Sequence, residues 1–383
     1  MVDMDMKQLV QMSVLSKQWR YFWKSFPYLN FDGRLWIEDK EETRGYHYLA
    51  KNMKIDEFIK FVTKVLNLRD GSTIKRIKTL KLIDTRIIHD EPELYDRNDE
   101  LGHLKKLELT CPTLENLVIE DKRLYERIII HAPCLKFLRI KSGTVLLICW
   151  DECVIKICAP NLRELQLRGG YFANYVLDNL CSLDNAQVDT AIRRHEKTEE
   201  ENEEEYAITD SGLCNLLKGL VSTKSLTLSA DAFQGETSAE IPYMFADVPQ
   251  FYNLKYFKLT NWRTNSCVPA LAKMFVRFPS MEALVLEKTT ESHPSSLAKE
   301  EEEWGEMYLT WGMFWNLKSV EIKGIECTDN ELKFLEFVLK KALVLESITV
   351  TPISTLSIAK LREFNRKIQR LSRAYSSVTI ILN

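Results

Sequence analysis

The chain has 383 residues, of which 45% are hydrophobic and 28% charged, and its formal net charge is −3. This composition is typical of a folded chain with a large core, either two or three globular domains or one elongated repeat array. The near-neutral charge disfavours nucleic acid and anionic membranes as partners, because both require a clear excess of basic residues. The nine cysteines are odd in number and show no paired spacing, which predicts free thiols and a location in the cytoplasm, the nucleus or both.

The first predicted element is a short aromatic helix from Val14 to Trp23. Its apolar face is too wide for a helix that is surrounded by solvent, so it must pack on the repeat array, on a partner or on both. A second helix is predicted from Asp56 to Leu68, where apolar residues follow a helical period and Asp70-Gly71 then ends it.

From residue 77 onward, apolar residues recur at the first, fourth and sixth positions of a short template. Copies of the template start at Ile77, Leu104, Leu114, Leu135, Leu162, Thr223 (a degenerate copy), Leu254, Met281, Leu317 and Leu345. Proline stands two residues before four of these starts, as in PNLRELQL from Pro160. The starts at 77 and 104, 135 and 162, and 254 and 281 are 27 residues apart, a spacing typical of leucine-rich repeats.

The template predicts one strand in each repeat. Its last two apolar positions are two residues apart, so they point to the same face of a strand, into the core. Helices are predicted in the intervals, from Ala270 to Phe278 and from Thr328 to Leu343, the latter capped by Thr328 or Asp329. Stacked units of this kind bury one continuous core, so the predicted fold is an α/β leucine-rich-repeat solenoid shaped like a horseshoe.

Two acidic stretches, Glu196–Glu205 and Glu300–Glu303, interrupt the repeats. We expect inserted loops near 186–208 and 290–305, either as disordered surface loops or as docking sites for a basic partner.

The N-terminal stretch closely resembles the second half of a plant F-box, in SVLSKQWR from Ser13, the pair Phe22-Trp23 and SFPYLNFD from Ser25. HAPCLKFLRI from His131 and ICAPNLRELQL from Ile157 are similar to the repeats of plant F-box proteins with leucine-rich repeats. The stretch from WNLKSVEIKGIE to the final LSRAYSSVTIILN resembles their FBD-type module. The resemblance covers almost the whole chain.

This resemblance implies a partial F-box at 1–32, a linker and capping helix at 33–75, repeats at 76–310 and an FBD-like cap at 311–383. It implies a substrate receptor of a cullin-RING (SCF-type) ubiquitin ligase, in which the F-box binds a Skp-type adaptor and the repeats hold a target protein. The family's F-box begins with a Leu-Pro segment and a helix, whereas only Met1–Leu9 precede Val10 here. The chain is therefore either a truncated receptor or a scaffold or decoy without ligase coupling.

Candidate binding residues follow from the family resemblance and from the strand pattern. The resemblance assigns adaptor binding to Val14, Leu15, Ser16, Trp19 and Trp23. The side chains between the buried strand positions point outward, and we expect them to bind the target or to be ordinary solvated residues. The target-binding candidates are Phe137, Arg139, Lys141, Arg168, Tyr256 and Lys258.

The sequence predicts no enzyme, no metal site and no cofactor. It contains neither a glycine-rich phosphate loop nor a Gly-x-Ser-x-Gly elbow, and its six histidines have no metal-ligand spacing. Cys149, Cys153 and Cys158 alternate with apolar residues, which favours core packing over zinc binding.

Overall fold

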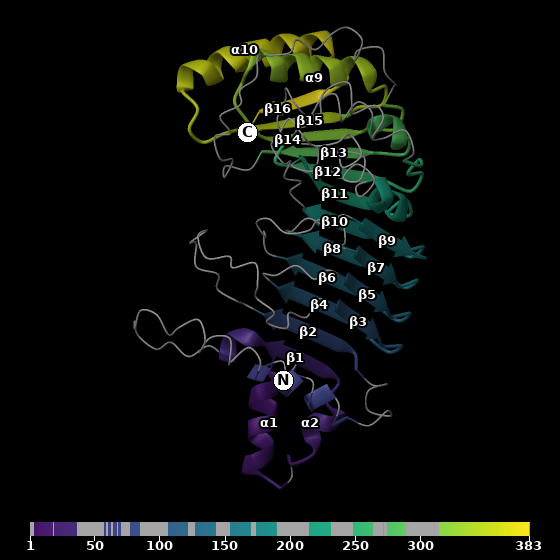
Figure 1. Ribbon diagram of the computed structural model, residues 1–383. Helices are drawn as coiled ribbons and strands as arrows, with labels where there is room; N and C mark the ends of the chain where they lie inside the picture. The colour runs from purple at the N-terminus through teal and green to yellow at the C-terminus, as the bar shows by residue number, and fades with distance from the viewer. Residues whose placement is uncertain are drawn as a thin grey trace, which may run out of the picture. The chain divides into compact units, whose positions relative to one another are not determined.

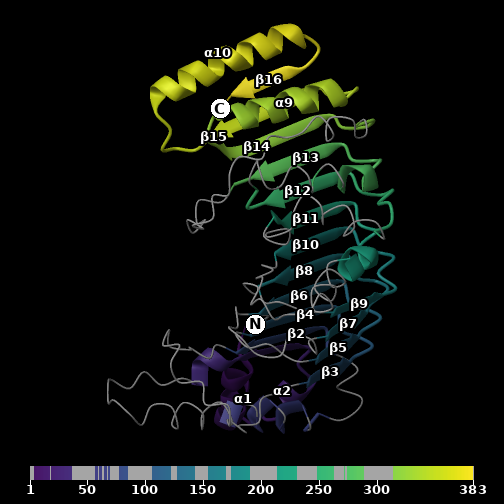
Figure 2. The ribbon, with the colours of Figure 1, turned by 45° about the horizontal axis from the view of Figure 1, so that its top comes forward.

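The chain forms two compact units, Met1–Ser182 and Leu183–Asn383, in a computed structural model (Figures 1 and 2). The structure describes residues 4–17, 19–36, 57–58, 60–62, 64–66, 68–69, 77–84, 106–121, 127–142, 154–169, 174–189, 214–230, 248–262, 271, 274–288 and 314–382. Both units are built on parallel strands, as an LRR-type solenoid requires, and each predicted template copy forms one of them. The horseshoe curvature stays a prediction.

The main sheet of the N-terminal unit consists of five parallel strands. In spatial order they are β1 (Tyr28–Asp32), β2 (Thr79–Asp84), β4 (Asn116–Asp121), β6 (Phe137–Ser142) and β8 (Glu164–Arg168). Equivalent template positions stand opposite each other, so that Leu117, Leu138 and Leu165 form one buried row. The template therefore fixes the register between strands, because a shift by one residue would turn this row to the outside.

A second parallel sheet runs beside the first in this unit (Figures 1 and 2). It contains β3 (Lys106–Thr110), β5 (Arg127–His131), β7 (Val154–Cys158) and β9 (Asn174–Asp178). The prediction of helices between the repeats was wrong here, because alternating residues such as Ile128 and Ile130 give β5 a buried face with the period of a strand. The spacing of 77 and 104 is not a repeat, since β2 and β3 belong to different sheets.

Tight turns join the second sheet to the first. The amide of Leu135 donates to the carbonyl of Ala132 over 3.0 Å, and Leu162 repeats this bond with Ala159. Pro133 and Pro160 occupy the second position of these turns, where the fixed φ of proline suits a β-turn and its missing N–H is not needed. This geometry explains why proline precedes the repeat template.

The C-terminal unit has a sheet of seven parallel strands among its described residues. These are β10 (Asn185–Asp189), β11 (Ser225–Ser229), β12 (Tyr256–Thr260), β13 (Ala283–Glu287), β14 (Ser319–Ile325), β15 (Ser347–Pro352) and β16 (Thr379–Leu382). Its connections include helical residues at 214–219 and 274–277, and the helices α9 (Asp329–Lys341) and α10 (Ile358–Ala374). Here the predicted alternation of strand and helix is confirmed.

Helix α9 has a strong start signal. Thr328 accepts a hydrogen bond from the amide of Glu331, and the Glu331 carboxylate accepts one from the amide of Thr328 over 2.8 Å. This capping box confirms the predicted N-cap. Before α9, β14 bulges at Gly324, whose φ of +78° would strain any other residue. A Cβ there would also lie 3.0 Å from the Lys288 carbonyl.

The N-terminal segment folds onto the first strand. Helix α1 (Met6–Leu15) lies against β1, and α2 (Phe22–Ser25) and the 3-10 turn η1 (Gly33–Trp36) follow. The predicted single helix from Val14 to Trp23 is wrong, because Ser16 adopts an extended conformation (φ −144°, ψ 135°) and ends α1.

Two loop predictions fall partly or wholly outside the described residues. The acidic insertion predicted near 186–208 begins too early, because Asn185–Asp189 forms β10 with Ala186 and Val188 buried. Only two apolar residues mark this strand, which is why the template missed it. The rest of that insertion, and the one near 290–305, lie outside the described residues.

Candidate protein-binding surfaces

The predicted target-binding residues of the N-terminal unit lie on neighbouring strands of the main sheet. Phe137, Arg139 and Lys141 alternate along β6 with the buried Leu138 and Ile140, so they point away from the core. Across the strand pair, Arg139 stands opposite Gln166 and Lys141 opposite Arg168. The sequence therefore brings these candidates to one face, although their binding role stays a prediction.

Arg139 is held in place by its neighbours. Its Nε donates to Oε1 of Gln166 over 2.8 Å, and its guanidinium lies 3.8 Å from the Glu120 carboxylate. The guanidinium also lies 5.6 Å from the ring centre of Phe137, within the range of a cation–π contact. Gln166 in turn donates to Glu164 over 2.6 Å. A partner would therefore meet a network that is already ordered, which lowers the entropic cost of binding.

Tyr256 and Lys258, the other two target-binding candidates, lie on β12 in the C-terminal unit. Both side chains are half-buried and point away from the buried Phe257 and Leu259. The Lys258 ammonium pairs with the Glu287 carboxylate on β13 at 2.5 Å. The charge of Lys258 is thus paired on the same face of the sheet. Tyr256 is the remaining candidate on β12 for binding a target protein.

The adaptor-binding candidates separate into exposed and buried residues. Val14 and Leu15, in the last turn of α1, are 83% and 85% exposed, whereas Trp23 on α2 is 7% exposed. Trp19 is half-buried, with its ring edge-on to Phe22 at 4.9 Å. Ser16 forms the C-cap of α1. The side chains that are open to a partner are therefore the aliphatic pair Val14-Leu15.

Two buried charged residues, Asp5 and Arg69, hold the N-terminal segment in place by hydrogen bonds. The sequence analysis did not predict either of them. The Asp5 carboxylate caps α1 by accepting from the amide of Lys7 over 2.6 Å, and it also accepts from the amide of Asp32 in β1 over 2.9 Å. Burial raises the pKa of Asp5, while these two amides oppose the shift. A helix cap followed by an apolar run was the available signal for Asp5.

Arg69 is the second anchor and is 3% exposed. Its guanidinium donates to the carbonyls of Trp23 at 3.1 Å and Phe26 at 2.5 Å, at the end of α2. Burial lowers the pKa of Arg69. Among the residues that the structure describes, no carboxylate pairs with Arg69, and the two backbone carbonyls accept its hydrogen bonds. No sequence pattern reveals such a contact, because more than forty residues separate donor and acceptor.

A ladder of alternating charges occupies the residues just before several main-sheet strands. In the N-terminal unit, the Glu115 carboxylate lies 3.6 Å from Lys78 and 2.9 Å from Lys136. In the C-terminal unit, Glu282 lies 2.6 Å from Lys255 and 2.8 Å from Lys318. Solvent screens these exposed pairs, so the ladder neutralises the turns more than it stabilises them.

The pKa of Glu282 reports this ladder directly. Hydrogen bonds and charge attraction from Lys255 and Lys318 lower that pKa to about 2. The stabilisation is complete above the ordinary pKa of 4.5 and is lost as the pH falls through about 2, because only the carboxylate binds the two ammonium groups.

In the double variant Lys255→Met/Lys318→Met, we expect the Glu282 pKa to return toward 4.5, measured by NMR titration. An unchanged pKa would contradict the ladder.

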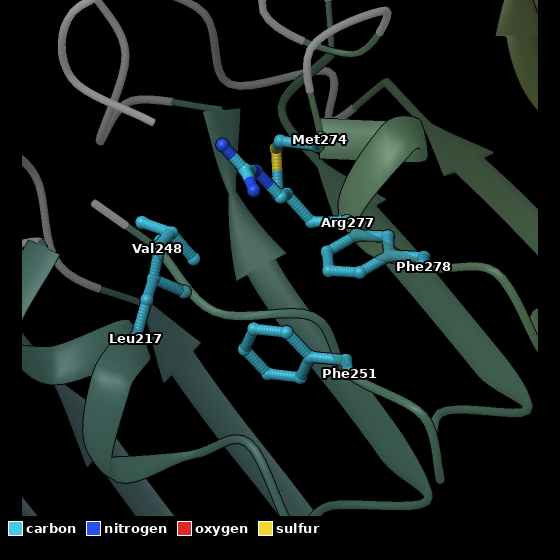
Figure 3. Close-up of a pocket in the computed structure, with 6 residues that line it drawn as sticks. All are labelled: Leu217, Val248, Phe251, Met274, Arg277 and Phe278. Atoms are coloured by element: carbon cyan, nitrogen blue, oxygen red, sulfur yellow. The ribbon is translucent and has the colours of Figure 1, made fainter. Parts of the chain in front are cut away.

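A small hollow in the C-terminal unit is part of the core. Figure 3 shows Leu217, Val248, Met274 and the rings of Phe251 and Phe278 around it. The two rings meet edge-on at 5.2 Å, and the lining side chains leave no room for a water molecule between them. It therefore cannot hold a small molecule.

Among the described residues, no cluster of three or more histidine, cysteine or carboxylate side chains could hold a metal ion. No described helix is long and apolar enough to cross a membrane. Cys149 and Cys153 lie outside the described residues, whereas Cys158 is a half-buried free thiol beside the buried Ile157.

Known proteins are similar to this chain both in its C-terminal part and over most of its length. The family model described as FBD matches residues 316–350, which contain β14, α9 and most of β15. This match lies within the predicted C-terminal module at 311–383.

Three relatives from Arabidopsis thaliana illustrate the similarity along the chain. A putative F-box/FBD/LRR-repeat protein is 23% identical over 346 residues, which cover 75% of this chain and 72% of the relative. An F-box/LRR-repeat protein is 25% identical over 68% of this chain and 57% of its own length. An FBD-associated F-box protein is 22% identical over 98% of this chain and 94% of its own length.

Proposed function

From the place of this chain among the plant F-box/FBD/LRR-repeat proteins, we propose that it is a substrate-recognition subunit of an SCF-type ubiquitin ligase. The observation that carries the proposal is a strand array with an FBD module, joined to an N-terminal segment that exposes an aliphatic pair. The array would hold a target protein, and the N-terminal segment would bind a Skp-type adaptor. Such a receptor performs no chemistry and needs no cofactor, because it only raises the local concentration of the target near the ligase.

The strand faces supply the target-binding part of the proposal. The network of Arg139, Gln166 and Phe137 offers an aromatic and an arginine side chain in fixed positions, the residue types that dominate binding energy in protein interfaces. Tyr256 would serve as a separate anchor in the C-terminal unit. We further propose the cytoplasm or nucleus as the location, since the six described cysteines are free thiols.

The alternative function is a scaffold or decoy that binds a target without ligase coupling. It is favoured by the burial of Trp23, because a side chain packed in the fold cannot reach an adaptor, and the Trp23 carbonyl is itself held by Arg69.

Adaptor binding distinguishes the two functions. We expect the chain to capture a purified Skp-type adaptor in a pull-down, and the double variant Val14→Glu/Leu15→Glu to lose this capture, because charged side chains cannot enter an apolar interface. Both residues are exposed, so the variant should keep its melting temperature.

The matched control is Leu343→Glu/Val344→Glu, an adjacent aliphatic pair in the C-terminal unit that is 56% and 46% exposed. This variant should bind the adaptor as the unmodified chain does. No capture by the unmodified chain would support the scaffold, and equal loss in both variants would contradict the assignment of Val14-Leu15.

A further inference from the structure

Helix α10 lies at the C-terminal end of the second unit, between β15 and β16 in the chain (Figures 1 and 2). Ser357 caps its start, and Phe364 and Ile368 are each 3% exposed, so this side of the helix is packed on the unit. The helix carries six basic residues and only one carboxylate, Glu363. It is therefore a strongly basic element in a chain whose net charge is −3.

Four arginines of α10 form a single stripe. At 100° per residue, Arg362, Arg366, Arg370 and Arg373 fall within an arc of about 80°, and the centre of this arc lies opposite Phe364 and Ile368. All four side chains are exposed. The stripe therefore points away from the core along three turns of the helix.

The nearby carboxylates are bound elsewhere. Asp329 on α9 and Glu363 pair with Lys367, at 2.7 Å and 3.4 Å. Glu331 is buried in the capping box of α9. Within the described part of the chain, no ion pair reaches any arginine of the stripe, whereas Glu282 in the turn ladder meets two lysines. Among the described residues, the positive charge of the stripe is thus uncompensated.

We propose that the arginine stripe of α10 is a docking surface for an acidic segment of a partner protein. Arginine suits this role better than lysine, because its planar guanidinium donates two parallel hydrogen bonds to one carboxylate or phosphate. The surface is independent of the proposed adaptor and target sites, since it uses neither the N-terminal segment nor the strand faces.

The spacing of the stripe indicates the form of the segment. Successive arginines are separated by about 4.5–6 Å along the helix axis. In an extended peptide, alternate side chains are about 6.6–7 Å apart and point the same way. Flexible arginine side chains bridge this small difference. An acidic residue at every second position of an extended segment would therefore meet the four arginines in turn.

Two other partners of a basic helix fit less well. A helix that inserts into a membrane surface needs a free apolar face, but Phe364 and Ile368 are buried. Single-stranded nucleic acid is bound by basic grooves with aromatic platforms for the bases, and the only aromatic residues of α10 and its C-cap are the buried Phe364 and the half-buried Tyr375. An acidic protein segment needs neither feature.

The test measures fluorescence polarisation of labelled peptides with the full chain. The probe is a synthetic peptide of alternating Glu and Gly, compared with the same peptide carrying Gln or phosphoserine in place of Glu. We expect the Glu peptide to bind, the Gln peptide not to bind, and the affinity to fall as salt is raised. Tighter binding of the phosphoserine peptide would also support the proposal and would identify phosphate as the preferred anion.

The quadruple variant Arg362→Gln/Arg366→Gln/Arg370→Gln/Arg373→Gln should weaken binding by roughly tenfold or more, through the loss of four charged contacts. Glutamine has nearly the helix propensity of arginine, so circular dichroism should stay unchanged. The control variant replaces four exposed lysines by glutamine and so removes the same charge: Lys64, Lys218, Lys333 and Lys340.

The control should bind the Glu peptide within about threefold of the unmodified chain, since bulk charge contributes only a screened attraction. Equal losses in the two variants would overturn the proposal, as would failure of the unmodified chain to bind the Glu peptide. Tighter binding of a single-stranded oligonucleotide or of vesicles rich in phosphatidylserine would overturn it as well, in favour of that partner.

Discussion

Replacing Trp262 by alanine is expected to lower the free energy of unfolding of the C-terminal unit by about 3–5 kcal/mol. Trp262 follows β12 and is 2% exposed, and its ring lies 5.2 Å from that of Phe334 on α9. Its amide donates to the carbonyl of Glu287 over 3.2 Å. The indole thus joins a strand repeat to the FBD helix, and its removal would leave a cavity that the rigid repeats cannot fill.

Urea denaturation followed by circular dichroism measures this effect. The matched control is Trp315→Ala, because Trp315 belongs to the same unit but is 60% exposed. We expect the control to change the free energy of unfolding by no more than about 0.5 kcal/mol. Equal shifts for the two tryptophans would show that Trp262 is not part of the core.

The change Arg69→Ala is expected to destabilise the N-terminal unit by about 3 kcal/mol. It removes two hydrogen bonds from a charged donor and leaves the buried carbonyls of Trp23 and Phe26 without a partner. It also removes the packing of a long aliphatic stem. The measurement is hydrogen exchange of the α1 and α2 amides, together with the unfolding midpoint in urea.

The control for Arg69 is Arg20→Ala, which removes the same charge at an exposed position beside the Tyr21 ring. It should leave exchange in α1 unchanged. We call the two hydrogen bonds from Arg69 to the carbonyls of Trp23 and Phe26 the arginine clamp. If Arg69→Ala changed hydrogen exchange and stability no more than this control, Asp5 and apolar packing alone would hold the N-terminal segment, and the arginine clamp would be wrong.

The arginine clamp also affects the proposed binding of an adaptor. Val14 and Leu15 project from α1, whose start is tied to β1 by Asp5 and whose neighbour α2 is tied by Arg69. Loss of the clamp should therefore weaken adaptor capture without any change at Val14 or Leu15, if the proposed adaptor surface is correct.

The strands of the main sheets could be predicted because their signal is local. Each template copy places two apolar side chains on one face of a short strand, and proline marks the turn before four of the ten copies. All ten copies become strands, and this repetition also brings Arg139 opposite Gln166 and Lys141 opposite Arg168. A helix cap at Thr328 or Asp329 could be predicted for the same reason, since a cap depends on neighbouring residues, and the structure has it at Thr328.

Three strands of the second sheet, β5, β7 and β9, were missed because no proline marks the turn before them. A stretch such as Arg127–His131 carries the period of a strand, but the search for template copies did not select it. The spacing between 77 and 104 was misleading for a related reason: template matches by themselves do not reveal which sheet a strand joins.

By itself, the sequence determined that this protein is a stack of parallel strands with apolar residues inside and mixed charges outside. Only the tertiary structure decided which of those charges are paired: Arg139 with Glu120 and Lys258 with Glu287. It also decided that the buried Arg69 donates its hydrogen bonds to carbonyls distant in the sequence. It also decided that Trp23 is buried, that Val14 and Leu15 are exposed, and that the arginines of α10 have no ion pair among the described residues. The reason is physical: burial and charge pairing depend on residues that are distant in sequence, whereas strand formation depends on neighbours.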